Sequence, residues 1–98
     1  MKIQAIKHTD DGKGGEFFVE NEQGNKLASM HYVHTGATLI IIDHTEVDAS
    51  LQGQGVGKKL LDATADYARE QAYKILATCP CALGQFERYP TKYADVVR

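Results

Sequence analysis

The sequence predicts an α/β domain with a mixed sheet, on the strength of two observations. The first is a set of four strand-like segments within residues 2–47, with alternating or β-branched apolar residues and short turns between them. The second is a change of pattern after residue 47, where a glycine-rich loop leads into a segment with the period of an amphipathic helix. A strand, a helix and a further strand in this order imply a parallel crossover, so antiparallel and parallel pairs would share one sheet.

The size and composition of the chain indicate one domain that spans residues 1–98. The chain is 43% hydrophobic and 24% charged, which argues against a disordered or collagen-like protein. Its formal net charge of −2 lacks the basic character of a duplex nucleic-acid binder. The longest aliphatic run, Leu39–Ile42, is far shorter than the ~20 residues of a membrane span. We therefore expect neither a nucleic-acid nor a membrane partner.

The cysteines and the chain start indicate the compartment. Cys79 and Cys81 are too close together to link distant parts of a fold, and secreted scaffolds usually have four or more cysteines. The first residues alternate in polarity and lack the apolar core of a signal peptide. We therefore expect a reducing, cytoplasmic location.

The first half of the chain predicts an antiparallel meander of four strands. Gly, Asp and Asn residues that supply positive φ angles are concentrated at residues 9–15, at residues 21–25 and at Gly36, where we place the turns. The last of the four strands is long and β-branched, as expected for a central strand covered on both faces. The predicted strands are residues 2–8, 16–20, 26–34 and 38–47.

The second half predicts a helix, a strand and a second helix. Residues 58–73 have one apolar stripe with alanine at three buried positions, so this helix can approach the sheet closely. Residues 74–79 form the predicted fifth strand, which Pro80 helps to end because proline has no backbone donor. A short helix over residues 82–89 would then end at Pro90. The tail that follows keeps three apolar residues with which it could dock: Tyr93, Val96 and Val97.

The loop before the first predicted helix has the composition of an anion-binding site. Small residues let a backbone approach a ligand, and the first turn of a helix offers free N–H groups at the positive end of its dipole. The Walker pattern fails because Lys58 is followed by Lys59, and alternating glycines after antiparallel strands fit a dinucleotide fold poorly. We expect a pyrophosphate here, with an ordinary tight turn as the alternative. The loop consists of Gln52, Gly53, Gln54, Gly55, Val56 and Gly57.

At these residues the chain resembles the GNAT superfamily of acetyl-CoA-dependent N-acetyltransferases. Gln52-x-x-Gly55-x-Gly57 matches the Q/R-x-x-G-x-G/A motif of that superfamily. The chain is still more similar to very short single-domain members, whose pattern is HTEV, then GxGxGxxL, then a cysteine at the end of the next strand. The matching segments cover about residues 38–89 and are His44-Thr45-Glu46-Val47, Gly53 to Leu60, and Cys79.

The resemblance implies a minimal GNAT fold with acetyl-CoA bound in a splayed cleft. The cleft would open where the strand ending at Val47 diverges from the strand ending at Cys79. The pantetheine arm would bond to backbone near Glu46 and Val47 like an extra strand. The backbone amides of residues 52–57 would hold the pyrophosphate, and the amide or ammonium of Lys58 would add to them.

Acetyl transfer to an amine needs a base, donors for an oxyanion and an acid for the leaving thiolate. Glu46 is the residue type that the wider family uses as base at this strand end, and His44 has a reference pKa of about 6.5. By simple alternation these two side chains share a face with Ile40 and Ile42, unless a bulge reverses the parity. The alternative is that both are solvated polar residues near a strand end.

Cys79 ends the strand that would line the cleft, so its thiol could face the thioester. With His44 on the opposite wall, a Cys/His pair and an acyl-cysteine intermediate are open alternatives; a small buried hydrophobe is the other reading. Tyr89 and Tyr93 are candidates for the acid, against a role in apolar packing. Cys79-x-Cys81 lacks the spacing of a zinc site, so we expect no metal.

The length of the chain bears on the acceptor. Ordinary GNAT enzymes are longer, and helices between their first two strands build the wall that holds the acceptor; here only residues 9–15 separate those strands. The acceptor side should therefore be open. This suits an amine on a protein or peptide, or a homodimer whose second subunit completes the pocket. It equally suits a non-catalytic module that binds or senses acetyl-CoA.

Overall fold

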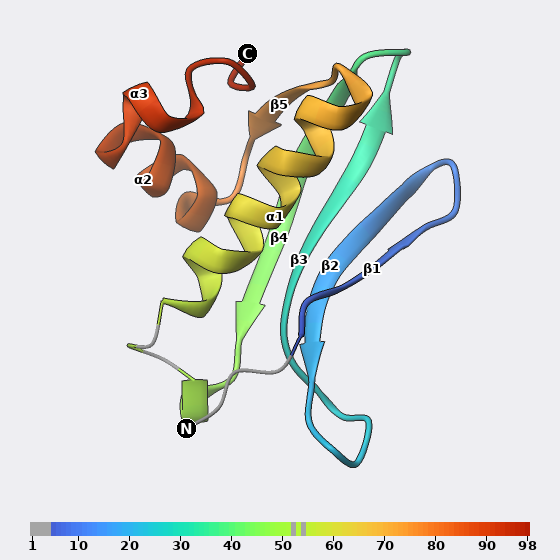
Figure 1. Ribbon diagram of the computed structural model, residues 1–98, viewed down its shortest axis with the longest axis vertical. Helices are drawn as coiled ribbons and strands as arrows, with labels where there is room; N and C mark the ends of the chain where they lie inside the picture. The colour runs from blue at the N-terminus through green and yellow to red at the C-terminus, as the bar shows by residue number, and fades with distance from the viewer. Residues whose placement is uncertain (1–4, 52, 54) are drawn as a thin grey trace.

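The computed structural model describes residues 5–51, 53 and 55–98, and it contains one five-stranded sheet with helices on one face (Figure 1). The strand order is β1-β2-β3-β4-β5, in which the first three pairings are antiparallel and β4 pairs with β5 in parallel. The strands are β1 (Lys7–Asp10), β2 (Gly14–Glu20), β3 (Lys26–Thr35), β4 (Leu39–Val47) and β5 (Lys74–Ala77). The helices are η1 (Ala49–Leu51), α1 (Val56–Gln71), α2 (Pro80–Arg88) and α3 (Pro90–Tyr93).

The mixed α/β fold class, the meander and the parallel crossover predicted from the sequence are confirmed, with a shift in the first hairpin. The predicted strand over residues 2–8 begins outside the described residues, and β1 continues to Asp10. The turn is shorter than predicted because the Asp11 carboxylate accepts hydrogen bonds from the backbone N–H groups of Lys13 and Gly14. The β1–β2 connection is therefore a tight hairpin.

Helix α1 begins at Val56, two residues before the predicted start. Gly55 is its N-cap in the left-handed conformation (φ 72°), which only glycine adopts without strain, and Val56 then packs into the core. The predicted apolar stripe is buried against the sheet as far as Ala68. Its last member, Ala72, is exposed, because the helix ends at Gln71 and Ala72 is the C-cap in the left-handed conformation. The fully buried members of the stripe are Leu60, Leu61, Thr64, Ala65 and Ala68.

Both prolines begin helices. Pro80 is the first residue of α2, so β5 ends at Ala77 and the second helix begins two residues before the predicted range 82–89. Pro90 ends α2 as predicted and also begins α3. Proline is favoured at the first position of a helix because its fixed φ is helical and its missing N–H has no partner to lose there.

The C-terminal tail docks on the domain. Tyr93 and Val96 are buried, and the Tyr93 hydroxyl donates a hydrogen bond of 2.6 Å to Asp62 of α1. Val97 forms a bridge with Ile75 of β5. These contacts hold α3 in place beside α2 and the edge of the sheet.

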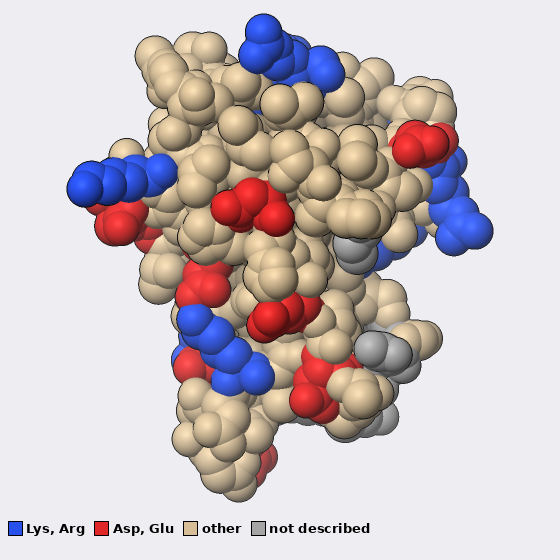
Figure 2. Space-filling view, turned by 180° about the vertical axis from the view of Figure 1, so that it is seen from behind, with Lys and Arg blue, Asp and Glu red and all other residues tan. Residues whose placement is uncertain are grey.

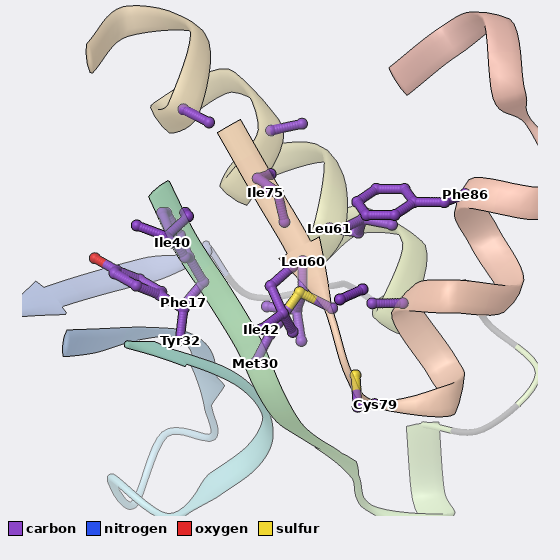
Figure 3. Packing of buried hydrophobic residues seen from close by; sticks show 14 of the residues in the cluster. Phe17, Met30, Tyr32, Ile40, Ile42, Leu60, Leu61, Ile75, Cys79 and Phe86 are labelled. Carbon is purple, nitrogen blue, oxygen red and sulfur yellow. The ribbon is translucent and has the colours of Figure 1, made fainter. Parts of the chain in front are cut away.

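One hydrophobic core lies between the sheet and the helices (Figure 3). Alternate residues of β3 and β4 point into it, and each fully buried aliphatic side chain contributes about 1.5–3 kcal/mol relative to an exposed one. Its large, completely buried members include Met30, Tyr32, Ile40, Ile42, Leu60, Leu61 and Ile75. In the described part of the chain, no helix is long and apolar enough to cross a membrane.

Candidate functional site

A β-bulge in β4 decides which side chains face the core. Tyr32 pairs with Ile42 and His31 pairs with His44, so Asp43 is an extra residue in β4. The parity therefore reverses, and the expectation that His44 and Glu46 share a face with Ile40 and Ile42 is wrong. Thr45 and Val47 lie on the core side, whereas His44 and Glu46 are exposed on the other side.

Strands β4 and β5 diverge just after this bulge. Their register runs from Leu39↔Lys74 to Ile42↔Ala77, and the last link is the Thr78 N–H, which donates to the carbonyl of Ile42 at 3.0 Å. Residues 43–47 then have β3 on one side and, within the described ranges, no strand on the other. Backbone groups along such an edge need partners, and an extended ligand can supply them.

Cys79 lies at the diverging end of β5, buried against β4. It is the N-cap of α2, and its Sγ is 3.3 Å from the Thr45 hydroxyl. The bulge brings Thr45 to Cys79 and places His44 on the opposite face of β4. The structure therefore does not form the Cys79–His44 pair that the sequence left open as an alternative, and Thr45 is a neighbour that the sequence did not indicate.

The candidate bases form a pair on the exposed face of β4. His44 Nε2 lies 2.9 Å from Glu46 Oε1, and the two side chains are 61% and 71% exposed. A second pair lies beside it, where His31 Nδ1 is 2.7 Å from Asp43 Oδ1. His31 is directly opposite His44 across the β3–β4 ladder. Neither His31 nor Asp43 stood out in the sequence, because only the bulge shows that they adjoin the candidate base.

The predicted anion loop leads into a helix end with an unusual charge pattern. Gly53 and Gly55 have left-handed φ angles of 81° and 72°; Gln52 and Gln54 lie outside the described residues. The first turn of α1 has no acidic residue and no side-chain cap at Gly55, and Lys58 lies within this turn. Lysines at a helix N-terminus oppose the helix dipole, so this end is suited to an anionic ligand rather than to its own side chains.

The two tyrosines considered as acids have different surroundings. Lys58 Nζ lies 4.6 Å from the centre of the Tyr89 ring, which brings the end of α2 to the start of α1. Tyr93 is buried, and burial together with its hydrogen bond to Asp62 raises its pKa. Tyr93 is therefore a packing residue, whereas Tyr89 adjoins the anion loop. Among the described residues, no group of three or more His, Cys, Asp or Glu side chains is arranged to hold a metal ion.

The comparisons with known proteins agree with this arrangement of strands, loop and helix. Residues 16–96 match the family model described as GCN5-related N-acetyl-transferase. The chain belongs to this family. Among curated proteins, it is 30% identical over 74 residues to Protein NATD1 of Gallus gallus, covering 76% of this chain and 67% of that protein. The Xenopus tropicalis protein of the same name is 29% identical over 75 residues, covering 76% of this chain and 69% of that one.

Solved structures of this family have the same fold. A Staphylococcus aureus protein described as GCN5-like is 38% identical, with a TM-score of 0.78; the match covers 100% of this chain and 91% of that one. Tetrahymena GCN5 is 16% identical, with a TM-score of 0.66, over 80% of this chain and 51% of that chain. The second match shows the fold alone, and it spans about half of the length of that chain.

Proposed function

We propose that this protein binds acetyl-CoA between β4 and the start of α1 and transfers the acetyl group to an amine. The observation that supports the coenzyme most directly is the first turn of α1, where Lys58 and Lys59 follow a glycine N-cap and no acidic residue is present. Such a helix N-terminus is electrostatically unfavourable in the free protein and favourable around a pyrophosphate. Its donors, backbone N–H groups and ammonium groups, are those that a phosphate requires.

The residues that would hold the coenzyme follow from this placement. Residues 52–57 and Lys58 would bind the pyrophosphate, in a loop where added side-chain atoms at Gly53 and Gly55 meet open space. The free edge of β4 at Glu46 and Val47 would bond the pantetheine arm. When bound, the coenzyme supplies an acetyl thioester, which is activated toward attack by an amine.

The bulge places His44, which is proposed to act on the amine, and Cys79, which could act on the thioester, on opposite faces of β4. On the exposed face, His44, oriented by Glu46, would take a proton from the attacking amine. The new C–N bond then forms as the C–S bond of the thioester breaks, and the thiolate takes up a proton as it leaves. Cys79 lies on the other face, beside Thr45, which favours direct transfer over an acyl-cysteine intermediate. The acceptor is proposed to be an amine on a protein or peptide, because in the described part of the chain β1 and β2 are joined by a three-residue turn, which builds no wall to enclose a small substrate.

A second candidate function is a non-catalytic module that binds or senses acetyl-CoA. The strong exposure of His44 and Glu46 favours this alternative, since a base in open water gains little from a pre-organised site. Such a module would bind the coenzyme with the same loop and release no CoA when an amine is added.

Amine-dependent release of CoA tests the proposal. We expect His44→Ala to lower the rate by about 10²–10⁴-fold, the usual contribution of a general base, while acetyl-CoA still binds. Cys79→Ala should lower it by less than about tenfold. Loss of activity in Cys79→Ala alone would indicate an acyl-cysteine route. Binding without any amine-dependent release in the unmodified protein would contradict transfer and support the module.

A further inference from the structure

The sheet face opposite the helices is open, and we define it as the open face. Figure 2, seen from behind relative to Figure 1, shows this side of the molecule. Alternation along the strands places Val33, Ile41 and Leu76 here, outside the core cluster, and Leu76 is 38% exposed. No helix in the described part of the chain covers this face. This face is therefore free to contact a ligand.

Two hollows indent the chain along this face. The first has a volume of about 330 Å³ and lies between the β1–β2 hairpin and β3, with Glu16, His31 and Val33 in its lining. The second has a volume of about 420 Å³ and lies at the end of β4, with Ser29 and Glu46 in its lining. Residues 29 and 31 are neighbours on one face of β3, roughly 7 Å apart. The hollows are therefore close enough for one extended chain to span both.

Carboxylates dominate the charge around the two hollows. The first is lined by Asp10, Asp11 and Glu16 against Lys13, and the second by Glu46 and Asp48 against Lys26. Asp43 lies beside His31, between them. The Asp10 carboxylate is bound by Tyr32 and by Tyr67 of α1, and Glu16 forms an ion pair with Lys26. The remaining charges are the carboxylates of Asp11, Asp43, Glu46 and Asp48 against the ammonium of Lys13. Figure 2 shows acidic side chains down the middle of the face, with most lysines and arginines toward its periphery.

We propose that the open face binds a cationic segment of a polypeptide, laid across both hollows, and that this segment contains the acceptor amine. The inference rests on the proposed function and specifies its substrate class. An amine bound in the second hollow would lie beside Glu46 and its partner His44, and flanking cationic residues would face the carboxylates of the first hollow. A second copy of the chain is a poorer occupant, because it would bring a surface with the same excess of negative charge.

Binding of matched peptides tests the charge requirement. We would measure fluorescence anisotropy with two labelled nonapeptides that share one central lysine and differ only in having lysine or glutamate at four flanking positions. We expect the cationic peptide to bind at least tenfold more tightly at low salt, with an advantage that shrinks as salt is raised. Equal affinity of the two peptides, or no binding of either, would overturn the inference.

Charge reversal on the two sides of the molecule locates the surface. The open-face variant is Glu16→Lys with Asp43→Lys, and the control is Glu70→Lys with Glu87→Lys, two exposed positions on α1 and α2. Both change the net charge by the same amount. We expect roughly tenfold weaker binding of the cationic peptide in the first variant and less than about twofold change in the second. Similar losses in both would show attraction to overall charge and overturn the proposed surface.

Further measurements keep the outcomes distinguishable. If circular dichroism shows that the charge-reversal variant is unfolded, the double variant Glu16→Gln with Asp43→Asn is used instead. We then expect a proportionately smaller loss of peptide affinity. A dimer in sedimentation that the open-face variant dissociates would overturn the inference in favour of a second copy. Acetyl-CoA binding and CoA release are measured on the same samples. If the protein neither binds acetyl-CoA nor releases CoA but still binds the cationic peptide on the open face, the proposed function is contradicted. If it binds acetyl-CoA and releases CoA but does not bind the peptide on this face, only the inference is contradicted.

Discussion

The region around Asp10 and the first turn of α1 differ in whether their polar groups are paired within the chain. Around Asp10 of β1, one carboxylate oxygen accepts hydrogen bonds from Tyr32 at 2.6 Å and Tyr67 at 3.3 Å and lies 2.7 Å from His34 Nε2. The other oxygen accepts from the N–H of Gly12 at 2.7 Å. The first turn of α1, by contrast, contains no acidic residue, and its N-cap is a glycine, which has no side chain to cap it. Polar groups that are paired inside the chain stabilise the fold, whereas an end left with unbalanced charge is suited to a ligand.

The Asp10 cluster also contains a histidine of β1. His8 Nε2 lies 2.6 Å from the Tyr32 hydroxyl, and the His8 ring stacks on Phe17 with 4.1 Å between centroids. Desolvation lowers the pKa of His8. Burial alone would raise the pKa of Asp10, but its hydrogen bonds from Tyr32, Gly12 and His34 hold that pKa well below the usual range.

The largest effect on stability is therefore expected at Asp10. Asp10→Asn replaces a charged acceptor of several hydrogen bonds with a neutral amide, and we expect a loss of about 1.5–3 kcal/mol in the free energy of unfolding at pH 7. Urea denaturation measures it. The matched control is Asp66→Asn, an exposed partner of Arg69, for which we expect less than about 1 kcal/mol. Acetyl-CoA affinity of the folded Asp10→Asn protein should be unchanged; a large loss of affinity would remove the distinction between the two regions.

Acid should weaken the same cluster. A carboxyl whose pKa is depressed in the folded state contributes stability above its unfolded pKa of about 3.9, and this is lost as the pH falls toward the folded value. The lowered pKa of His8 acts in the same direction, since its neutral form is favoured in the folded state and the contribution falls below about pH 6.5. The free energy of unfolding should thus decrease from pH 7 to pH 3, and Asp10→Asn should flatten the lower part of that curve. An equally steep decrease of the unfolding free energy in the variant would show that other groups cause the loss of stability in acid.

Local sequence patterns were enough to predict the meander, the crossover helix and the docked tail. Each of these depends on periodicity or turn chemistry within a short stretch, as in residues 58–73. The bulge at Asp43 depends on how β4 pairs with β3, and nothing in the run from Leu39 to Val47 marks it. The sides taken by His44 and Glu46, and the contact between Thr45 and Cys79, could therefore not be predicted.

The Asp10 cluster was invisible to sequence reasoning for a related reason. Its members come from β1, β3 and α1, and only the folded sheet brings Asp10, Tyr32 and Tyr67 together. The turn before α1 could be predicted because its glycines are contiguous in sequence, and Gly53 and Gly55 do have left-handed φ angles ahead of the helix. Anion binding by this loop stays a prediction.

The smallest predicted effect concerns Lys58, whose substitution should lower acetyl-CoA affinity with almost no change in stability. In Lys58→Gln, relief of the unfavourable helix-dipole interaction (about 0.3–1 kcal/mol) and loss of the contact with the Tyr89 ring (about 0.5–1 kcal/mol) nearly cancel. We expect the free energy of unfolding to change by less than about 0.5 kcal/mol and acetyl-CoA affinity to fall by roughly fivefold. Lys92→Gln, which also removes a lysine from a tyrosine ring, should leave the affinity unchanged. Equal effects of the two substitutions on affinity would contradict the role of Lys58.

Calorimetric titration with acetyl-CoA tests the central claim most directly, using two variants with the same backbone strain. Gly55 and Gly36 both have φ of 72°, and an added Cβ atom meets nothing within 4 Å at either position. Gly55→Glu and Gly36→Glu should therefore cost similar stability, but only the first places a carboxylate at the anion loop. We predict micromolar binding, near −8 kcal/mol, in the unmodified protein and in Gly36→Glu, and none in Gly55→Glu. No binding by the unmodified protein, or unchanged binding by Gly55→Glu, would contradict the account.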